Sequence, residues 1–333
     1  MKLHLFKPYT CYIIAVLLLT GMSCDQKKSS PGLSGGGIAA KDALATLQVA
    51  DGFKIEMIAS EPQITSPVDM EIDEYGRMYV VEMHGYPLDK SGSGNIVLLS
   101  DTNGDGIMDK RTVFKEGLVL PTGILRWKKG LLVTDSPNIY YLEDSDGDGK
   151  ADIMDTVLTG FALTNPQHNL NNPVYGLDNW IYAAHEGVVK SRDYVKEFGD
   201  EGTGIYYPST PDGVRLPQNA SGRSVRFRPD QLALEELASR CQFGHTFDKW
   251  GHWFGCNNSN QGYQEIIADR YLTRNPQLPP TDPVQPMSDH LDAPELFPTT
   301  ANPDRQIFTD VGTMTSGSGL TAYLGDAFPA PYS

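Results

Sequence analysis

The chain has 333 residues, of which 33 are glycine and 23 are proline. Typical usage is about 7% glycine and 5% proline, so turns are frequent here and a helical bundle is excluded. The 40% of hydrophobic residues excludes global disorder, and the formal net charge of −15 argues against nucleic acid as a partner.

The first 23 residues have the pattern of a bacterial lipoprotein signal peptide. Lys2 and Lys7 precede an apolar stretch over residues 11–22 that is too short to span a bilayer. We expect residues 1–23 to be removed, Cys24 to carry a lipid as the only membrane anchor, and the Gly- and Ser-rich residues 24–38 to form a flexible tether. The alternative is ordinary cleavage that leaves a soluble protein. Either route places the domain in the cell envelope, facing the periplasm or the cell surface.

A recurring phrase dominates the chain after a short helical segment expected around residues 39–49. Each copy has apolar residues, a turn of the Asp/Gly type and an aromatic-rich strand; the copies begin at Pro67, Pro121, Pro173 and Gln242. Each copy predicts a β-hairpin, and intervals of roughly 40 to 70 residues suit four-stranded blades. We therefore predict an all-β domain over residues 39–333. It is a β-propeller with four blades and the start of a fifth at residues 319–324, six-bladed when complete, so that the chain is truncated.

Two stretches interrupt this rhythm. Residues 191–222 are expected to form an insertion on one face, and the proline-dense residues 271–306 are expected to cross the surface without regular structure. Long irregular loops on a rigid scaffold are frequent places for ligand contacts.

Two acidic loops match the first half of an EF-hand-type calcium loop, D-x-[DN]-x-[DN]-G. The expected Ca²⁺ ligands are Asp101, Asn103, Asp105 and Asp109 in the first loop, and Asp144, Asp146, Asp148, Asp152 and Asp155 in the second. Asp155 stands at the twelfth position, where a bidentate ligand usually lies, whereas the first loop has Thr112 there. The second loop is therefore expected to bind Ca²⁺ more tightly, in a structural role. A solvated acidic turn is the alternative.

Cys241 and Cys256 are the cysteines that remain for pairing in the mature domain. They flank the predicted hairpin turn at residues 248–251. In an oxidising compartment this predicts a disulfide; the alternative is two small buried thiols. The sequence has no CxxC motif, which excludes covalent c-type haem.

His168 and Arg240 each stand just before a repeat, the third and the fourth, where a side chain can reach the centre of a propeller. A neutral imidazole there can accept a proton from a sugar hydroxyl. A guanidinium there can hold a carboxylate or an oxyanion. The alternatives are an ordinary loop histidine and a rim ion pair.

Several strings together carry a family resemblance: residues 58–62 (IASEP), 80–87 (VVEMHGYP), 176–182 (GLDNWIY) and 244–252 (GHTFDKWGH), with the two acidic loops. From about residue 40 onward the sequence resembles the propeller of the membrane-bound dehydrogenases related to soluble glucose and sorbosone dehydrogenases. The resemblance implies oxidation of a sugar or polyol with pyrroloquinoline quinone (PQQ) and Ca²⁺. It also implies a c-type cytochrome as electron acceptor.

The same resemblance implies roles for two residues. His168 stands ten residues before Asp178, and Arg240 stands four before Gly244, which are the intervals that quinoproteins keep around the general base and the PQQ-contacting arginine. It implies that His168 takes the hydroxyl proton while hydride passes to the quinone, and that Arg240 steadies the negative charge. The sequence departs from the family at Gln167, where an acidic residue is usual.

Two other functions remain open. A non-catalytic propeller would present Trp127, Trp180, Trp250 and Trp253 to carbohydrate or to a partner protein, although packing between blades also explains these tryptophans. A calcium-dependent lactonase would hold an ion in the central channel through oxygens such as those of Asn171, Asn172, Asn257 and Asn258.

Overall fold

The computed structural model describes residues 38–190, 192, 194, 196–275, 277, 282–287 and 316–328. Cys24 and residues 1–37 of the predicted signal and tether lie outside these. The chain divides into two compact units, Met1–Glu56 and Met57–Ser333. In the first unit, α2 (Ala40–Ala43) and the 3₁₀ helix η1 (Leu44–Thr46) confirm the expected helical segment in a shorter form. None of the described helices has the length and apolar character needed to cross a membrane.

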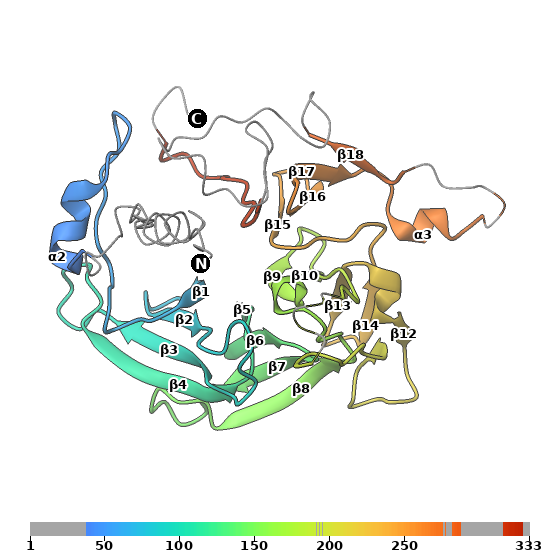
Figure 1. Cartoon of the computed structure of the whole chain (residues 1–333), viewed down its shortest axis with the longest axis horizontal. Helices are drawn as coiled ribbons and strands as arrows, with labels where there is room; N and C mark the ends of the chain where they lie inside the picture. Colours follow the sequence, from blue (N-terminus) through green and yellow to red (C-terminus); the bar gives the residue numbers. More distant parts are fainter. Residues whose placement is uncertain are drawn as a thin grey trace, which may run out of the picture. The chain divides into compact units, whose positions relative to one another are not determined.

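The second unit is built from antiparallel sheets (Figure 1). The first sheet contains β1 (Pro67–Ile72), β2 (Met78–Glu82), β3 (Gly94–Ser100) and β4 (Lys110–Leu118). The second contains β5 (Gly123–Trp127), β6 (Gly130–Asp135), β7 (Asn138–Glu143), β8 (Ile153–Thr159), β11 (Gly204–Tyr206) and β12 (Arg215–Gln218). The third contains β9 (Asn171–Tyr175), β10 (Ile181–Ala184), β13 (Val225–Arg228) and β14 (Ala233–Glu236). The fourth contains β15 (His245–Phe247), β16 (Trp253–Asn257), β17 (Asn260–Glu265) and β18 (Val284–Pro286).

The first strands of successive sheets lie beside one another. The Asp69 carboxylate in β1 accepts a hydrogen bond from the backbone N–H of Ile124 in β5, at 2.8 Å. The Asn172 side chain in β9 accepts one from the backbone N–H of His245 in β15, also at 2.8 Å. Sheets that join through their first strands in this way are the blades of a β-propeller. The predicted all-β propeller is confirmed, with four blades among the described residues.

The four repeated phrases form the first hairpin of each sheet, as predicted. In three of them the carboxylate of Asp73, Asp178 or Asp248 accepts a hydrogen bond from a backbone N–H two residues further along. This local bond closes the turn before any long-range contact forms. The second hairpin lacks such an aspartate, and Lys128 makes its turn with a φ of 53°.

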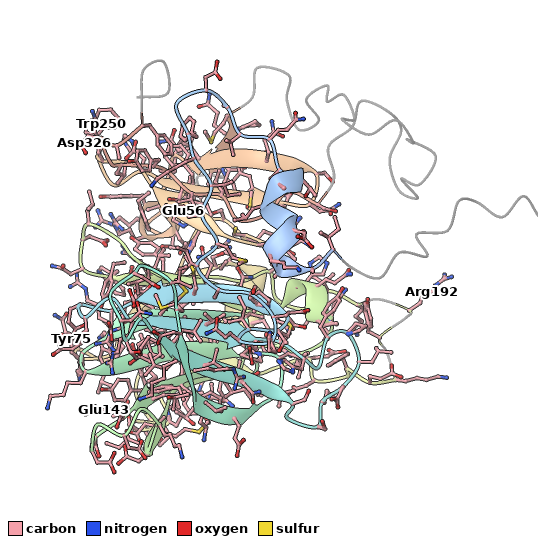
Figure 2. All side chains as sticks on the ribbon, turned by 90° about the vertical axis from the view of Figure 1, so that its left-hand side faces the viewer. Glu56, Tyr75, Glu143, Arg192, Trp250 and Asp326 are labelled. Atoms are coloured by element: carbon pink, nitrogen blue, oxygen red, sulfur yellow. The ribbon has the colours of Figure 1, made fainter. Side chains whose placement is uncertain are left out.

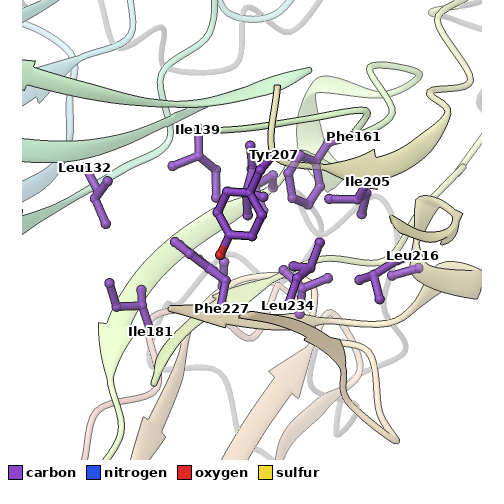
Figure 3. Packing of buried hydrophobic residues seen from close by; sticks show 14 of the residues in the cluster. Leu132, Ile139, Phe161, Ile181, Ile205, Tyr207, Leu216, Phe227 and Leu234 are labelled. Carbon is purple, nitrogen blue, oxygen red and sulfur yellow. The ribbon is translucent and has the colours of Figure 1, made fainter. Parts of the chain in front are cut away.

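The largest hydrophobic cluster joins the second and third sheets (Figure 3). It contains Phe161, Phe227 and Ile139, which are fully buried, together with the aromatic ring of Tyr207. Each such side chain contributes about 1.5–3 kcal/mol through burial. This packing holds the third sheet, which carries His168 on its preceding loop, firmly against the second.

The expectation that residues 271–306 are irregular was wrong in part, and the insertion at residues 191–222 contains a hairpin. Part of the insertion at residues 191–222 folds into β11 and β12, which extend the second sheet because Tyr206 pairs with Thr159 of β8. The short helix α3 (Asp269–Leu272) overlaps the start of residues 271–306, which were expected to be irregular. Within that range β18 (Val284–Pro286) pairs with β17 as an edge strand. An edge position tolerates proline because its missing N–H faces away from the ladder.

Residues 319–324, expected to be a strand, contain none. The segment lies alongside β15 and the residues just before it. Gly319 donates its backbone N–H to the carbonyl of Phe243 (3.1 Å), and Ala322 donates its backbone N–H to the Thr246 hydroxyl (3.0 Å). One carbonyl and one side-chain hydroxyl do not make a strand ladder. The segment therefore covers the first strand of the fourth sheet without joining a sheet.

Candidate functional site

A cavity of about 1010 Å³ opens where the loops preceding the first strands of the four sheets meet. Its walls combine polar and apolar groups. The apolar side chains include Val68, Met83 and Phe243, and the polar side chains are mostly amides and hydroxyls, with one carboxylate and one imidazole: Ser66, Asp69, His84, Tyr86, Thr122, Gln167, Asn171, Asn172, Gln242, Asn258, Ser316, Ser318 and Thr321. Among the described lining residues the ionisable side chains are those of Asp69, His84 and Tyr86, and lysine and arginine are absent. Such walls suit an uncharged ligand with several hydroxyl groups.

His168 lies at the edge of this cavity with a carboxylate behind it. It ends the 3₁₀ helix η2 (Pro166–His168), whose first turn the Asn165 side chain caps. His168 Nδ1 lies 2.5 Å from Oε2 of Glu186, a carboxylate whose side chain is only 9% exposed. Because a carboxylate only accepts hydrogen bonds, Nδ1 donates to Glu186, and in the neutral form of the ring Nε2 carries the lone pair.

The other ring nitrogen of His168 contacts a residue of the cavity wall. Its Nε2 lies 3.5 Å from the amide nitrogen of Gln242, which lines the cavity together with Gln167. An imidazole that a carboxylate orients, with its other nitrogen able to accept a hydrogen bond, is the usual arrangement of a general base. The structure thus brings the predicted His168 together with Glu186, which the sequence analysis missed.

Glu186 has counterparts in the first two sheets. Glu82 ends β2 and accepts a hydrogen bond from the backbone N–H of Thr65 (2.9 Å), before β1. Asp135 ends β6 and accepts from the backbone N–H groups of Val119 (2.9 Å) and Leu120 (2.8 Å), before β5. Glu186 follows β10 by two residues and binds the loop before β9, but through an imidazole instead of the backbone. An acidic residue at this place in three of the four repeats is the sequence signal that could have revealed it.

Arg240 is not brought together with His168. The residue is exposed, it is absent from the described cavity lining, and its backbone carbonyl accepts a hydrogen bond from the Tyr263 hydroxyl. Its predicted role in holding an anion stays a prediction.

The four asparagines of the lactonase alternative all use their amide oxygens internally. Asn171 accepts from the backbone N–H of Gly244, Asn172 from His245, Asn257 from Ser259 and Asn260, and Asn258 from Ser316. These bonds fix the loops around the fourth sheet. They give the asparagines a structural role and weaken the lactonase alternative.

Three of the four tryptophans pack against other side chains, which is the alternative explanation given for them above. The Trp127 ring meets Tyr141 edge to face, Trp253 donates its indole N–H to His245, and Trp180 lies under the guanidinium of Arg226. Trp250 alone of the four projects from the ribbon, with 70% of its surface exposed (Figure 2).

Cys241 and Cys256 are both free and buried in the structure. Their thiols converge on the carbonyl of Gly244, at 2.9 Å and 3.4 Å. Burial raises the pKa of the Cys241 thiol well above its ordinary value. The structure therefore shows the second of the two predicted alternatives, and the disulfide stays a prediction for oxidising conditions.

The second acidic loop gathers three of its predicted Ca²⁺ ligands. One carboxylate oxygen each from Asp144, Asp146 and Asp148 lies within 4.8 Å of the others. Asp152 instead accepts hydrogen bonds from the backbone and hydroxyl of Ser145, which lower its pKa.

In the first loop Asp109 accepts hydrogen bonds from Thr102 in the same way. Asp101 accepts hydrogen bonds from the backbone N–H groups of Gly106 and Gly104, which lower its pKa. Asp109 and Asp152 therefore close the loops, and the other acidic side chains also accept backbone hydrogen bonds within the loops.

Residues 39–333 match the family described as "Domain of unknown function (DUF7133)". This chain belongs to the DUF7133 family. No curated protein matches the sequence of this DUF7133 chain.

Solved structures similar to the DUF7133 chain are distant. The PQQ-bound form of aldose sugar dehydrogenase from Streptomyces coelicolor is 14% identical (TM-score 0.38), with 64% of this chain and 62% of that chain covered. The holo form of the pyranose dehydrogenase PQQ domain from Coprinopsis cinerea is 15% identical (TM-score 0.35; 66% and 47% covered). Virginiamycin B lyase from Staphylococcus aureus is 13% identical (TM-score 0.34; 60% and 52% covered). The DUF7133 chain thus spans less than two thirds of each, and the likeness is limited to the fold.

The described cavity does not match PQQ, the cofactor that the sequence resemblance implies. PQQ carries three carboxylates, and buried anions need cationic partners. The described lining has no lysine or arginine, and its acidic side chain, Asp69, is half-buried; desolvation raises its pKa to about 6.

Proposed function

We propose that the DUF7133 chain is a dehydrogenase-type propeller domain that binds a neutral sugar or polyol in its central cavity. The observation that carries the proposal is the His168–Glu186 pair at the edge of a cavity lined by amides and hydroxyls. Amide and hydroxyl groups exchange hydrogen bonds with a polyhydroxylated ligand without the cost of burying a charge.

In this proposal His168 accepts the proton of a ligand hydroxyl at Nε2. Glu186 holds the ring through Nδ1 and stabilises the imidazolium that forms. Gln242, at 3.5 Å from Nε2, is placed to donate its amide N–H to the same ligand oxygen. Oxidation also removes a hydride from the hydroxyl-bearing carbon. This hydride would pass to a diffusible two-electron acceptor, and a c-type cytochrome is the proposed partner that takes the electrons from that acceptor one at a time.

The experiment measures ligand binding and dye reduction in parallel. The purified chain is titrated calorimetrically with D-glucose, D-xylose and sorbitol, and dye reduction is followed with each, with and without PQQ and Ca²⁺. Binding with turnover supports the dehydrogenase. Binding without turnover in either condition favours the non-catalytic carbohydrate-binding propeller, and no binding of any of the three compounds overturns the proposal.

We also propose that the second acidic loop binds a structural Ca²⁺. Ca²⁺ prefers six to eight oxygen ligands from short acidic loops. The convergence of Asp144, Asp146 and Asp148 supplies three of them, between β7 and β8 and far along the sheet from the cavity-lining loops. An anchored lipoprotein outside the cytoplasm would meet this cation in the surrounding medium.

A further inference from the structure

His84 lines the cavity and, like His168, has a carboxylate beside it. Its Nε2 lies 3.4 Å from Oε2 of Glu82 and 3.1 Å from the hydroxyl of Thr65. Glu82 is fully buried and already paired with the Arg111 guanidinium at 3.0 Å. That guanidinium pairs with the carboxylate, and a neutral His84 ring with its proton on Nε2 can donate a hydrogen bond to the Thr65 hydroxyl or to Glu82.

The other ring nitrogen of His84 is open. Among the described residues none contacts its Nδ1, and the side chain is 34% exposed on the cavity wall. With the proton on Nε2, Nδ1 presents a lone pair to the cavity. A hydroxyl group of a ligand is the complementary donor.

The backbone holds this ring in place. A Cβ added at Gly85 would lie 2.4 Å from the carbonyl oxygen of Asp89 and 3.1 Å from that of Val119. The turn after His84 is therefore packed so closely that only glycine fits there. His84 is presented from a rigid support.

The loops of the two histidines touch. The Tyr86 hydroxyl accepts a hydrogen bond from Nε2 of Gln167 at 2.9 Å. Tyr86 stands two residues after His84, and Gln167 stands one before His168. A ligand that reaches His168 therefore lies beside the wall that carries His84.

We propose that His84 is a specificity-determining residue whose Nδ1 accepts a hydrogen bond from a second hydroxyl of the ligand bound at His168. This inference rests on the proposed function, because it needs a polyol in the same cavity. It narrows the ligand to neutral compounds with at least two hydroxyl groups. A carboxylate or phosphate would present a further acceptor to Nδ1, with no cation in the described lining to compensate.

Two substitutions of His84 distinguish the contacts of its two ring nitrogens, Nδ1 and Nε2. In His84→Asn the amide oxygen takes the place of Nδ1, so the contact with the ligand is kept. In His84→Gln the amide reaches the place of Nε2, so the contacts with Glu82 and Thr65 are kept and the ligand contact is lost. His252→Gln is the matched control, because His252 pairs with Asp248 in an exposed turn outside the cavity.

Calorimetric titration of each variant with sorbitol and D-glucose tests the proposal. We expect His84→Gln to weaken binding by about 5- to 10-fold, with His84→Asn and His252→Gln within about twofold of the parent. In the parent chain with ¹⁵N-labelled histidine, sorbitol should shift the Nδ1 resonance of His84.

The outcomes separate this inference from the proposed function. If the parent binds sorbitol and His84→Gln binds it equally well, or the Nδ1 resonance does not move, this inference is overturned and the proposed function stands. If the parent binds none of the compounds, both are overturned.

Discussion

Glu186 occupies in the third sheet the place that Asp135 occupies in the second. Each carboxylate comes at the end of the second strand of its sheet and binds the loop that precedes the first strand. Asp135 holds that loop by two backbone N–H groups, whereas Glu186 holds it by the imidazole of His168. A position that is structural in one blade therefore orients a candidate base in another.

This relationship predicts that substitutions at the two positions lower the free energy of unfolding by different amounts. Asp135→Ala leaves the buried N–H groups of Val119 and Leu120 without their acceptor, which should lower the free energy of unfolding by about 2–5 kcal/mol. Glu186→Gln keeps an acceptor for Nδ1 of His168 and should cost less than about 1 kcal/mol. Urea unfolding of both variants measures the difference. Equal losses would contradict the assignment of different roles.

Much of the fold could be predicted from the sequence because its signals are local. The side chains of Asp73, Asp178 and Asp248 accept hydrogen bonds from backbone N–H groups two residues further along, so the hairpins can be predicted from short stretches of sequence. The strand β18 and the hairpin β11–β12 could not be predicted, because pairing with a distant partner strand forms them. Residues 319–324 have a strand-like sequence, yet the structure gives them contacts with β15 through only scattered hydrogen bonds.

The candidate site was predictable only in part. His168 could be singled out by its place before a repeat, whereas Glu186 lies 18 residues further along, and the hairpin of β9 and β10 brings the two together. His84 was overlooked as a site residue because its partners, Glu82 and Thr65, give no spacing pattern. The exposure of Arg240 depends on the packing of neighbouring loops, which spacing alone does not specify.

The second acidic loop predicts a calcium-dependent stability. If Ca²⁺ binds Asp144, Asp146 and Asp148, a concentration 100 times its Kd adds about 2.7 kcal/mol and raises Tm by about 5–10 °C. Asp148→Asn should abolish most of this rise, since it removes one charged ligand and keeps the hydrogen bond from the backbone N–H of Lys150.

Thermal unfolding in EDTA and in millimolar Ca²⁺ measures this effect. Asp105→Asn in the first loop is the matched control and should keep most of the rise. A Tm that is equal in EDTA and in Ca²⁺ would contradict the calcium assignment.

A buried histidine predicts a pH-dependent stability. Burial lowers the pKa of His185 to about 4, against 6.5 for an ordinary histidine. Between these values the unfolded chain binds the proton more readily than the folded chain, so the contribution is present above pH 6.5 and is lost as the pH falls towards 4. The ring packs edge to face on Phe161 at 5.2 Å, so His185→Phe should fit while removing the titration.

Unfolding free energies of the parent and of His185→Phe at pH 7 and pH 5 test this. From pH 7 to pH 5, the free energy of unfolding of the variant should rise by about 2 kcal/mol relative to that of the parent. A difference that stays constant between the two pH values would show that His185 is protonated, or solvated, in the folded chain.

The most direct measurement of the central claim is the steady-state turnover of His168→Ala with the compound that the parent chain oxidises, with and without added imidazole. General base catalysis predicts a loss in kcat of about 10²- to 10⁴-fold, partial recovery with imidazole, and little change in the Kd of the ligand. A kcat equal to that of the parent would contradict the assignment of His168 as the base.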